Sequence, residues 1–203
     1  MKVALIGASG NAGSKILTEL LNRGHEVAGI VRNIEKLQSS PGLTARRGDV
    51  NDAAGLPPLL SGHDAVISSV RFQTTDPKIL ISAAKKAGVP RLLVVGGAGS
   101  LLLADGTALI DTPAFPGAYK PEASAGREFL NLLRGDRELN WTFLSPSALF
   151  IPGERTGKFR LGLDQLLSDD KGESRISMED YAIAMVDELE TPRHNRRRFT
   201  VGY

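Results

Sequence analysis

Three glycines near the start of the chain have the spacing of a phosphate-binding turn. Gly7, Gly10 and Gly13 follow an apolar strand over residues 3–6 and precede a helical segment over residues 14–21. Gly7 permits a tight exit from the strand, Gly10 lets a phosphate approach the backbone, and Gly13 lets the helix pack closely. The free N–H groups of the helix start attract negative charge, so we expect a dinucleotide pyrophosphate here. The residues predicted to contact it are Gly7, Ser9, Gly10, Asn11, Ala12 and Gly13. A glycine-rich turn that binds nothing is the alternative.

The next candidates follow the later strands. Arg32 ends the second predicted strand, about 20 residues after the glycines, where an acidic residue bonds a ribose 2′-hydroxyl and a basic one receives a 2′-phosphate. Arg32 therefore favours NADP(H) over NAD(H), unless it pairs with Glu35 on the surface. We expect Asp49 and Val50 beside the adenine, although Asp49 suits a structural turn equally well. Ser69, Val70 and Gly96 are predicted to complete the cofactor site.

Alternating strands and helices must position these residues. The predicted strands are residues 3–6, 25–31, 43–48, 64–70, 91–95 and 141–144, with helical segments between them. This alternation predicts an α/β, Rossmann-type, doubly wound parallel sheet of order 3-2-1-4-5-6. We expect a single domain over residues 1–203. Residues 146–175 would form a small, loop-rich C-terminal substrate region on the acceptor side, followed by a helix over residues 178–189 with Ser177 as its cap.

Composition excludes several classes of chemistry. The chain has 203 residues, no cysteine and a net charge of +2. Disulfides, thiolate catalysis and zinc–thiolate sites are therefore excluded, and a reducing cytoplasm is the expected location. No apolar run approaches the ~20 residues that a membrane span needs. The charge does not favour nucleic acid, the basic run Arg196–Arg198 is expected on a solvated surface, and the scattered histidines predict no metal site. The oligomeric state stays open, with a homodimer among the possibilities.

Several segments together resemble the atypical short-chain dehydrogenase/reductases. They are the glycine turn, Val31-Arg32, Gly48-Asp49-Val50, Asp64-Ala65-Val66-Ile67 and residues 94–101. Within that group the chain is most similar to the NAD(P)H-binding, NADH-flavin reductase-like proteins, which are relatives of biliverdin reductase B and of the NmrA-like proteins. The resemblance covers nearly the whole chain and implies a nicotinamide cofactor, without fixing a substrate.

One departure from the wider superfamily bears on mechanism. Active dehydrogenases carry Tyr-x-x-x-Lys, in which the lysine lowers the tyrosine pKa for proton exchange. Here Lys120 directly follows Tyr119, and Ala123 stands where the lysine would be. Hydride transfer from NADPH to a flavin, a quinone or a similar conjugated acceptor demands less, because the cofactor carries the chemistry. We therefore predict an NAD(P)H-dependent reductase with a small-molecule acceptor, and a flavin is one expected substrate.

The residues expected at the acceptor come from three segments. In the related reductases a functional serine follows the fifth strand, and the matching residue here is Gly97. Ser100 is the only hydroxyl in that loop segment, so Ser100 and Tyr119 are the candidate catalytic residues. The candidate substrate residues are Pro146, Ser147 and Arg155. Arg155 would bind a flavin phosphate or carboxylate, unless it forms a salt bridge with Glu154 or Asp164.

Two other functions remain open from the sequence. One is an NmrA-like sensor that binds NADP(H) and changes its affinity for a protein partner without catalysis. The missing lysine at Ala123 and the missing serine at Gly97 favour that reading. The other is an epimerase or dehydratase acting on nucleotide sugars. It is weaker, because such enzymes normally need the tyrosine–lysine pair and a larger C-terminal domain.

Overall fold

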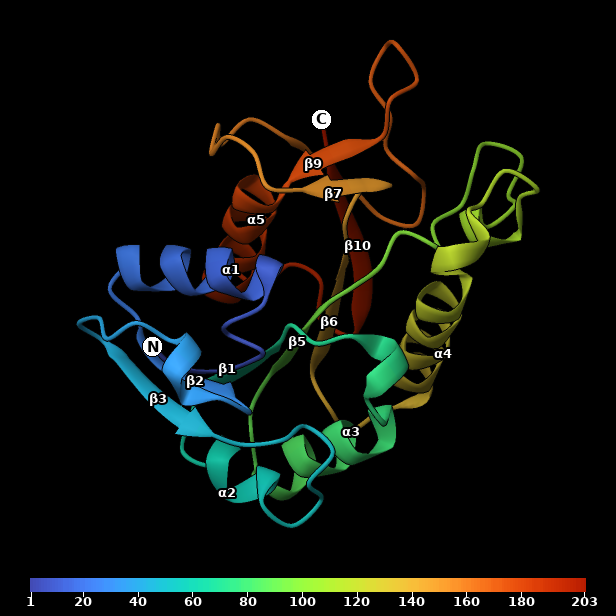
Figure 1. Ribbon diagram of the computed structural model, residues 1–203. Helices are drawn as coiled ribbons and strands as arrows, with labels where there is room; N and C mark the ends of the chain where they lie inside the picture. The colour runs from blue at the N-terminus through green and yellow to red at the C-terminus, as the bar shows by residue number, and fades with distance from the viewer.

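The computed structural model describes residues 1–203, and its centre is an eight-stranded sheet of order β3-β2-β1-β4-β5-β6-β10-β8 (Figure 1). The strands are β1 Lys2–Ile6, β2 Glu26–Val31, β3 Leu43–Arg47, β4 Ala65–Ser68, β5 Leu92–Val95, β6 Trp141–Ser145, β8 Arg160–Gly162 and β10 Arg197–Gly202. All are parallel except β8, which runs antiparallel to β10. The predicted order 3-2-1-4-5-6 is confirmed, and β10 and β8 extend the sheet beyond β6.

Helices cover both faces of the sheet (Figure 1). They are α1 Asn11–Asn22, α2 Leu56–Leu60, α3 Pro77–Lys86, α4 Lys120–Gly135 and α5 Met178–Glu190. Helices α1 and α5 pack together on one face, whereas α2, α3 and α4 lie on the other. Because each face has its own core, the central strands β1, β4 and β5 are buried on both sides, whereas the edge strand β3 is largely exposed.

Strand β1 illustrates how one short segment serves both cores. Val3 and Leu5 belong to the cluster under α1 and α5, while Ala4 and Ile6 belong to the cluster under α2, α3 and α4. Successive side chains of a strand point to opposite faces, so a continuous apolar run buries both. The strand therefore lies in the middle of the molecule. Because it ends at Ile6, the glycine turn that follows lies at the carboxyl edge of the sheet.

The region expected to be loops contains short strands. Residues 146–175 include β7 Leu149–Ile151 and β8, and β7 pairs in parallel with β9 Arg175–Ser177. Ser177 caps α5, as expected, by accepting a hydrogen bond from the N–H of Asp180. The fully buried Asp180 carboxylate accepts from the N–H groups of Thr156 and Gly157 at 2.8 Å each, which ties the 153–157 segment to α5. No helix is long and apolar enough to cross a membrane.

Candidate functional site

A first pocket of about 290 Å³ opens at the carboxyl ends of β1, β2, β3 and β4. Ligands of open α/β sheets bind in the crevice at this edge. Eight residues predicted to contact the cofactor line it: Gly7, Ser9, Gly10, Arg32, Asp49, Val50, Ser69 and Val70. The structure therefore brings together residues that lie as far apart in the sequence as the first and fourth strands.

The glycines of the turn have no room for a side chain. Gly7 has a φ of +81°, and a Cβ on it would lie 2.1 Å from the carbonyl oxygen of Ser69. A Cβ on Gly13 would lie 2.1 Å from the carbonyl oxygen of Gly7. Both neighbours are backbone atoms that cannot swing aside, so the turn and α1 pack as closely as the dinucleotide fingerprint requires.

The start of α1 is free to accept an anion. Its N-cap is Gly10, no side chain caps the helix, and no acidic residue occupies the first turn. The predicted contacts Asn11, Ala12 and Gly13 form that first turn, and their N–H groups precede the helical hydrogen-bond ladder. A phosphate beside Gly10 would satisfy these donors and the positive end of the helix dipole.

Two unpaired cations face the first pocket. Arg32 and Arg71 both line it, both are exposed, and neither forms an ion pair. The alternative pairing of Arg32 with Glu35 does not form. One carboxylate oxygen of Asp49 accepts from the N–H of Asn51 at 2.9 Å, so Asp49 builds a turn and lines the pocket at once.

A second pocket of about 350 Å³ lies between the ends of β5 and β6 and the start of α4. Four residues predicted for the acceptor line it: Ser100, Tyr119, Pro146 and Ser147. Gly96, which the sequence assigns to the cofactor site, lines this second pocket and not the first. The apolar side chains Phe72, Leu109, Phe115 and Phe150 also line it and are missing from the prediction. These four come from separate segments with no shared motif, so only their convergence in three dimensions identifies them.

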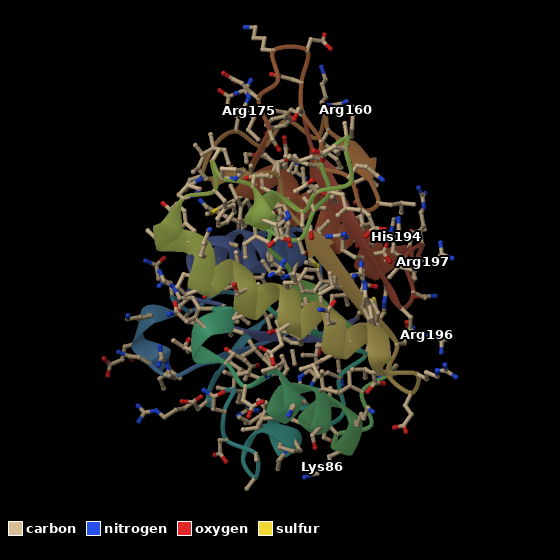
Figure 2. All side chains as sticks on the ribbon, turned by 90° about the vertical axis from the view of Figure 1, so that its right-hand side faces the viewer. Lys86, Arg160, Arg175, His194, Arg196 and Arg197 are labelled. Carbon is tan, nitrogen blue, oxygen red and sulfur yellow. The ribbon has the colours of Figure 1, made fainter.

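Ser100 lines this pocket and contacts the buried Arg198. The Arg198 guanidinium donates to the Ser100 hydroxyl oxygen at 3.3 Å and pairs with Asp164. Burial lowers the pKa of Arg198, and the Asp164 carboxylate opposes that shift. The Ser100 hydroxyl thus accepts from a charged donor and donates to no protein group. The expectation that the basic run Arg196–Arg198 lies on a solvated surface holds for Arg196 and Arg197, which are exposed (Figure 2), and is wrong for Arg198, which is buried because it pairs with Asp164 and contacts Ser100.

Tyr119 stands at the mouth of the second pocket with an exposed side chain. The position of the superfamily's lysine is occupied by Ala123, which is packed against the loop that follows β5. Ala123 packs against Gly99 so closely that a Cβ on Gly99 would lie 2.8 Å from the Ala123 Cβ. By contrast, a Cβ on Gly97 would meet only the Phe72 ring, at 3.7 Å, so the backbone leaves room there for the serine of related reductases.

The polar groups of the second pocket are largely committed elsewhere. The buried Ser147 hydroxyl donates to the carbonyl of Val201 at 2.9 Å, so this residue contributes shape and no free donor. One guanidinium nitrogen of Arg127, the only cation that lines the pocket, donates to both carboxylate oxygens of Asp111, at 2.9 and 2.8 Å. The pocket's other charged group is the Glu122 carboxylate, which accepts hydrogen bonds from the N–H groups of Phe72 and Gln73. The pocket therefore offers apolar and aromatic surface with few free polar groups, and both of its charged side chains are engaged by protein partners.

Arg155 lies in neither pocket. Its guanidinium forms a bidentate pair with the buried Glu19 carboxylate of α1, at 2.9 Å for each bond, and pairs with neither Glu154 nor Asp164. The hydrogen bond from Arg155 lowers the pKa of Glu19, burial opposes it, and Arg23 reinforces it. The structure thus gives Arg155 a packing role and does not bring it to the predicted acceptor side.

Replacing Arg155 by alanine is expected to lower the free energy of unfolding at pH 7 by about 1 kcal/mol, because Arg23 still pairs with Glu19 and Arg155 is half exposed. The depressed pKa of Glu19 contributes stability above its ordinary value of 4.5, and this contribution is lost as the pH falls through the lowered value. Urea unfolding should therefore separate wild type from Arg155→Ala at pH 7, and the difference should shrink below pH 4.5 and vanish once the pH lies below the lowered pKa of Glu19. Lys158→Ala, on the same loop, is the control. If Arg155→Ala instead changed the KM for the acceptor and left the free energy of unfolding unchanged, Arg155 would have the acceptor-binding role that the sequence predicts.

Comparisons with known proteins agree with this architecture. The NAD(P)H-binding family model matches residues 7–192. The uncharacterized protein YwnB of Bacillus subtilis is 44% identical over 99% of this chain and 98% of its own length. A solved structure from Bacteroides thetaiotaomicron, described as a "putative epimerase", is 46% identical with a TM-score of 0.95, covering 100% of this chain and 96% of that one. Another from Streptococcus pneumoniae, described as a "putative NADH-flavin reductase", is 40% identical with a TM-score of 0.86, covering 100% and 99%.

Proposed function

We propose that this chain, which belongs to the NAD(P)H-binding family, is a reductase that passes hydride from NADPH to an uncharged, flat, conjugated acceptor such as a flavin or a quinone. The observation that carries the proposal is the pair of adjoining pockets. Arg71 lines the first and Phe72, the next residue, lines the second. A dinucleotide bound at the glycine turn would thus end beside an aromatic-lined space. The Streptococcus pneumoniae neighbour supports the same class of acceptor.

The residues of the first pocket would bind the cofactor, and those of the second would bind the acceptor and supply a proton. The glycine turn and the start of α1 would bind the pyrophosphate, and Arg32 would bind a 2′-phosphate. Bound NADPH supplies the hydride, which is the difficult part of the chemistry. The second pocket would hold the acceptor ring against Phe72, Phe115 and Phe150. Ser100, which accepts a hydrogen bond from Arg198, is the proposed proton donor, and Tyr119 at the mouth carries the other hydroxyl of the pocket that donates to no protein group.

The experiment is a steady-state assay of NADPH oxidation with riboflavin, FMN and quinones, run beside calorimetry of NADPH and NADP⁺ binding. Turnover with at least one acceptor is the expected result. Cofactor binding without any turnover would overturn the reductase and favour a sensor, especially if the two redox forms bind with different affinities. Turnover of a nucleotide sugar would instead favour an epimerase, the description given to the Bacteroides neighbour.

The charge distribution of the second pocket makes a prediction about the acceptor. Riboflavin and FMN should have KM values within about a factor of 3, because an exposed ion pair contributes about 0–1 kcal/mol and Arg127 is already paired with Asp111. The measurement is KM for both flavins at saturating NADPH, in wild type and in Arg127→Gln. A KM for FMN that is lower by tenfold, and that rises to the riboflavin value in the variant, would contradict an uncharged acceptor.

A further inference from the structure

A short turn forms the wall between the two pockets. It contains the 3₁₀ helix Phe72–Thr74 and connects β4 to α3. Arg71, Thr74 and Thr75 line the first pocket, whereas Phe72 lines the second. Any displacement of this turn would therefore move an unpaired cation of the cofactor site and an aromatic wall of the acceptor site together.

Side chains from two distant segments hold the turn. The Glu122 carboxylate, in the first turn of α4, accepts from the N–H of Phe72 at 2.8 Å and from the N–H of Gln73 at 2.9 Å. On the other side, the Asn51 side chain donates to the carbonyl of Thr74 at 2.8 Å and accepts from the N–H of Asp76 at 2.8 Å. Four hydrogen bonds from outside the turn thus fix its backbone.

The packing of the Phe72 ring also holds this turn in place. It stacks on Phe143 with centroids 5.9 Å apart and meets Phe129 edge-on at 5.6 Å. On α4, a Cβ on Gly126 would lie 2.9 Å from the Phe72 ring, so this glycine lets the ring approach the helix. Because Glu122 and Gly126 are one helical turn apart, the same stretch of α4 holds both the backbone and the ring of Phe72.

We propose that Glu122, which itself lines the second pocket, is a positioning residue that couples the acceptor pocket to the cofactor pocket through its two hydrogen bonds to the turn. This inference rests on the proposed function, since it assigns a cofactor to the first pocket and an acceptor to the second. A carboxylate suits the role because it offers two acceptor oxygens to two adjacent N–H groups. Glutamine offers one oxygen, and its NH₂ group would face the other N–H as a second donor. Both bonds to the turn are charge-assisted and therefore stronger than bonds between neutral groups.

The test compares Glu122→Gln and Glu122→Ala with Glu128→Gln. Glu128 is exposed on the same helix and its side chain forms no ion pair or hydrogen bond, so it is the matched control. In the protein without ligand, hydrogen exchange at the N–H groups of Phe72 and Gln73 should become at least about tenfold faster in Glu122→Gln, because one charge-assisted bond is lost. Exchange at these two positions should be unchanged in Glu128→Gln.

The two sites should then weaken together. We expect the Kd for NADPH and the KM for the acceptor each to rise about tenfold in Glu122→Gln, and further in Glu122→Ala, with kcat changed less. A residue that only stabilised the fold would lower the melting temperature and leave both constants unchanged, and one that acted only as a wall of the second pocket would change the acceptor KM and leave the Kd for NADPH unchanged. If Glu122→Ala does not fold, Glu122→Gln carries the test.

Two results would overturn the role of Glu122. One is unchanged exchange at Phe72 and Gln73 in Glu122→Gln, and the other is wild-type affinity for NADPH in that variant. Failure of the proposed function has a different signature, because the wild-type protein itself would then bind no nicotinamide cofactor or reduce no acceptor. The exchange measurement needs no ligand, so it distinguishes the two failures.

Discussion

A Gly13→Ala variant is expected to lose cofactor binding by at least about 100-fold and to be destabilised by about 3 kcal/mol. The added Cβ would lie 2.1 Å from the carbonyl oxygen of Gly7 and 3.0 Å from its carbonyl carbon. Neither atom belongs to a side chain that could rotate away, so α1 must move off the turn. That displacement would remove the N–H groups at the start of α1 from the pyrophosphate that we propose they bind.

Calorimetry with NADPH and urea unfolding measure the two effects of Gly13→Ala. Gly135→Ala is the control, because a Cβ on Gly135, the last residue of α4, has nothing within 4 Å and should be neutral or slightly stabilising. Near wild-type NADPH affinity in Gly13→Ala would mean that the cofactor does not depend on the close approach of α1. The glycine turn would then be a structural βα connection.

The sequence predicts the residues of the first pocket because they follow from a local glycine turn and from the order of the parallel strands. A strand, a glycine turn and a helix adjoin in the chain, and the parallel order of strands brings the ends of β2, β3 and β4 to the same edge. Arg32, Asp49 and Val50 are therefore placed by fold class alone. Arg71 and Asn51 also line this pocket, and each directly follows a residue that the glycine-and-strand pattern identifies.

The second pocket is less predictable because its walls come from segments with no repeating pattern. Phe72, Phe115 and Phe150 each look like an isolated apolar residue in the sequence, and only the packed fold brings them together. The role of Glu122 is hidden for the same reason, since its two backbone partners lie about 50 residues away, beyond any local pattern.

Arg155 shows the opposite error, in which a conspicuous charge in a glycine-rich segment suggests a ligand. The partner that it finds is Glu19, a carboxylate whose burial on α1 is invisible without the packing of α1 against α5. A buried carboxylate is strongly destabilising unless it is paired, so the Glu19 carboxylate of α1 needs a cation, and Arg155 pairs with it. An exposed arginine can therefore pair with a buried carboxylate or bind a ligand, and the sequence alone does not show which of the two it does.

An Arg32→Ala variant is expected to weaken NADPH binding by about 10- to 100-fold and to leave NADH binding within about threefold of wild type. The basis is that hydrogen bonds to a charged group contribute about 1.5–3 kcal/mol, and Arg32 is an unpaired cation of the first pocket. It follows β2 at the position that contacts the adenosine ribose in this fold. NADH lacks the 2′-phosphate and would lose only a long-range attraction.

Two further variants separate recognition of the 2′-phosphate from general attraction of anions. Arg71→Ala should weaken NADPH and NADH to a similar extent, because Arg71 follows β4 on the pyrophosphate side of the pocket. Arg47→Ala removes an equal charge from the neighbouring strand β3, outside the pocket, and should change neither affinity appreciably. Calorimetry of both cofactors against all three variants gives the answer. If Arg32→Ala weakens the two cofactors equally, Arg32 acts on a group that they share, and the preference for NADPH loses its basis.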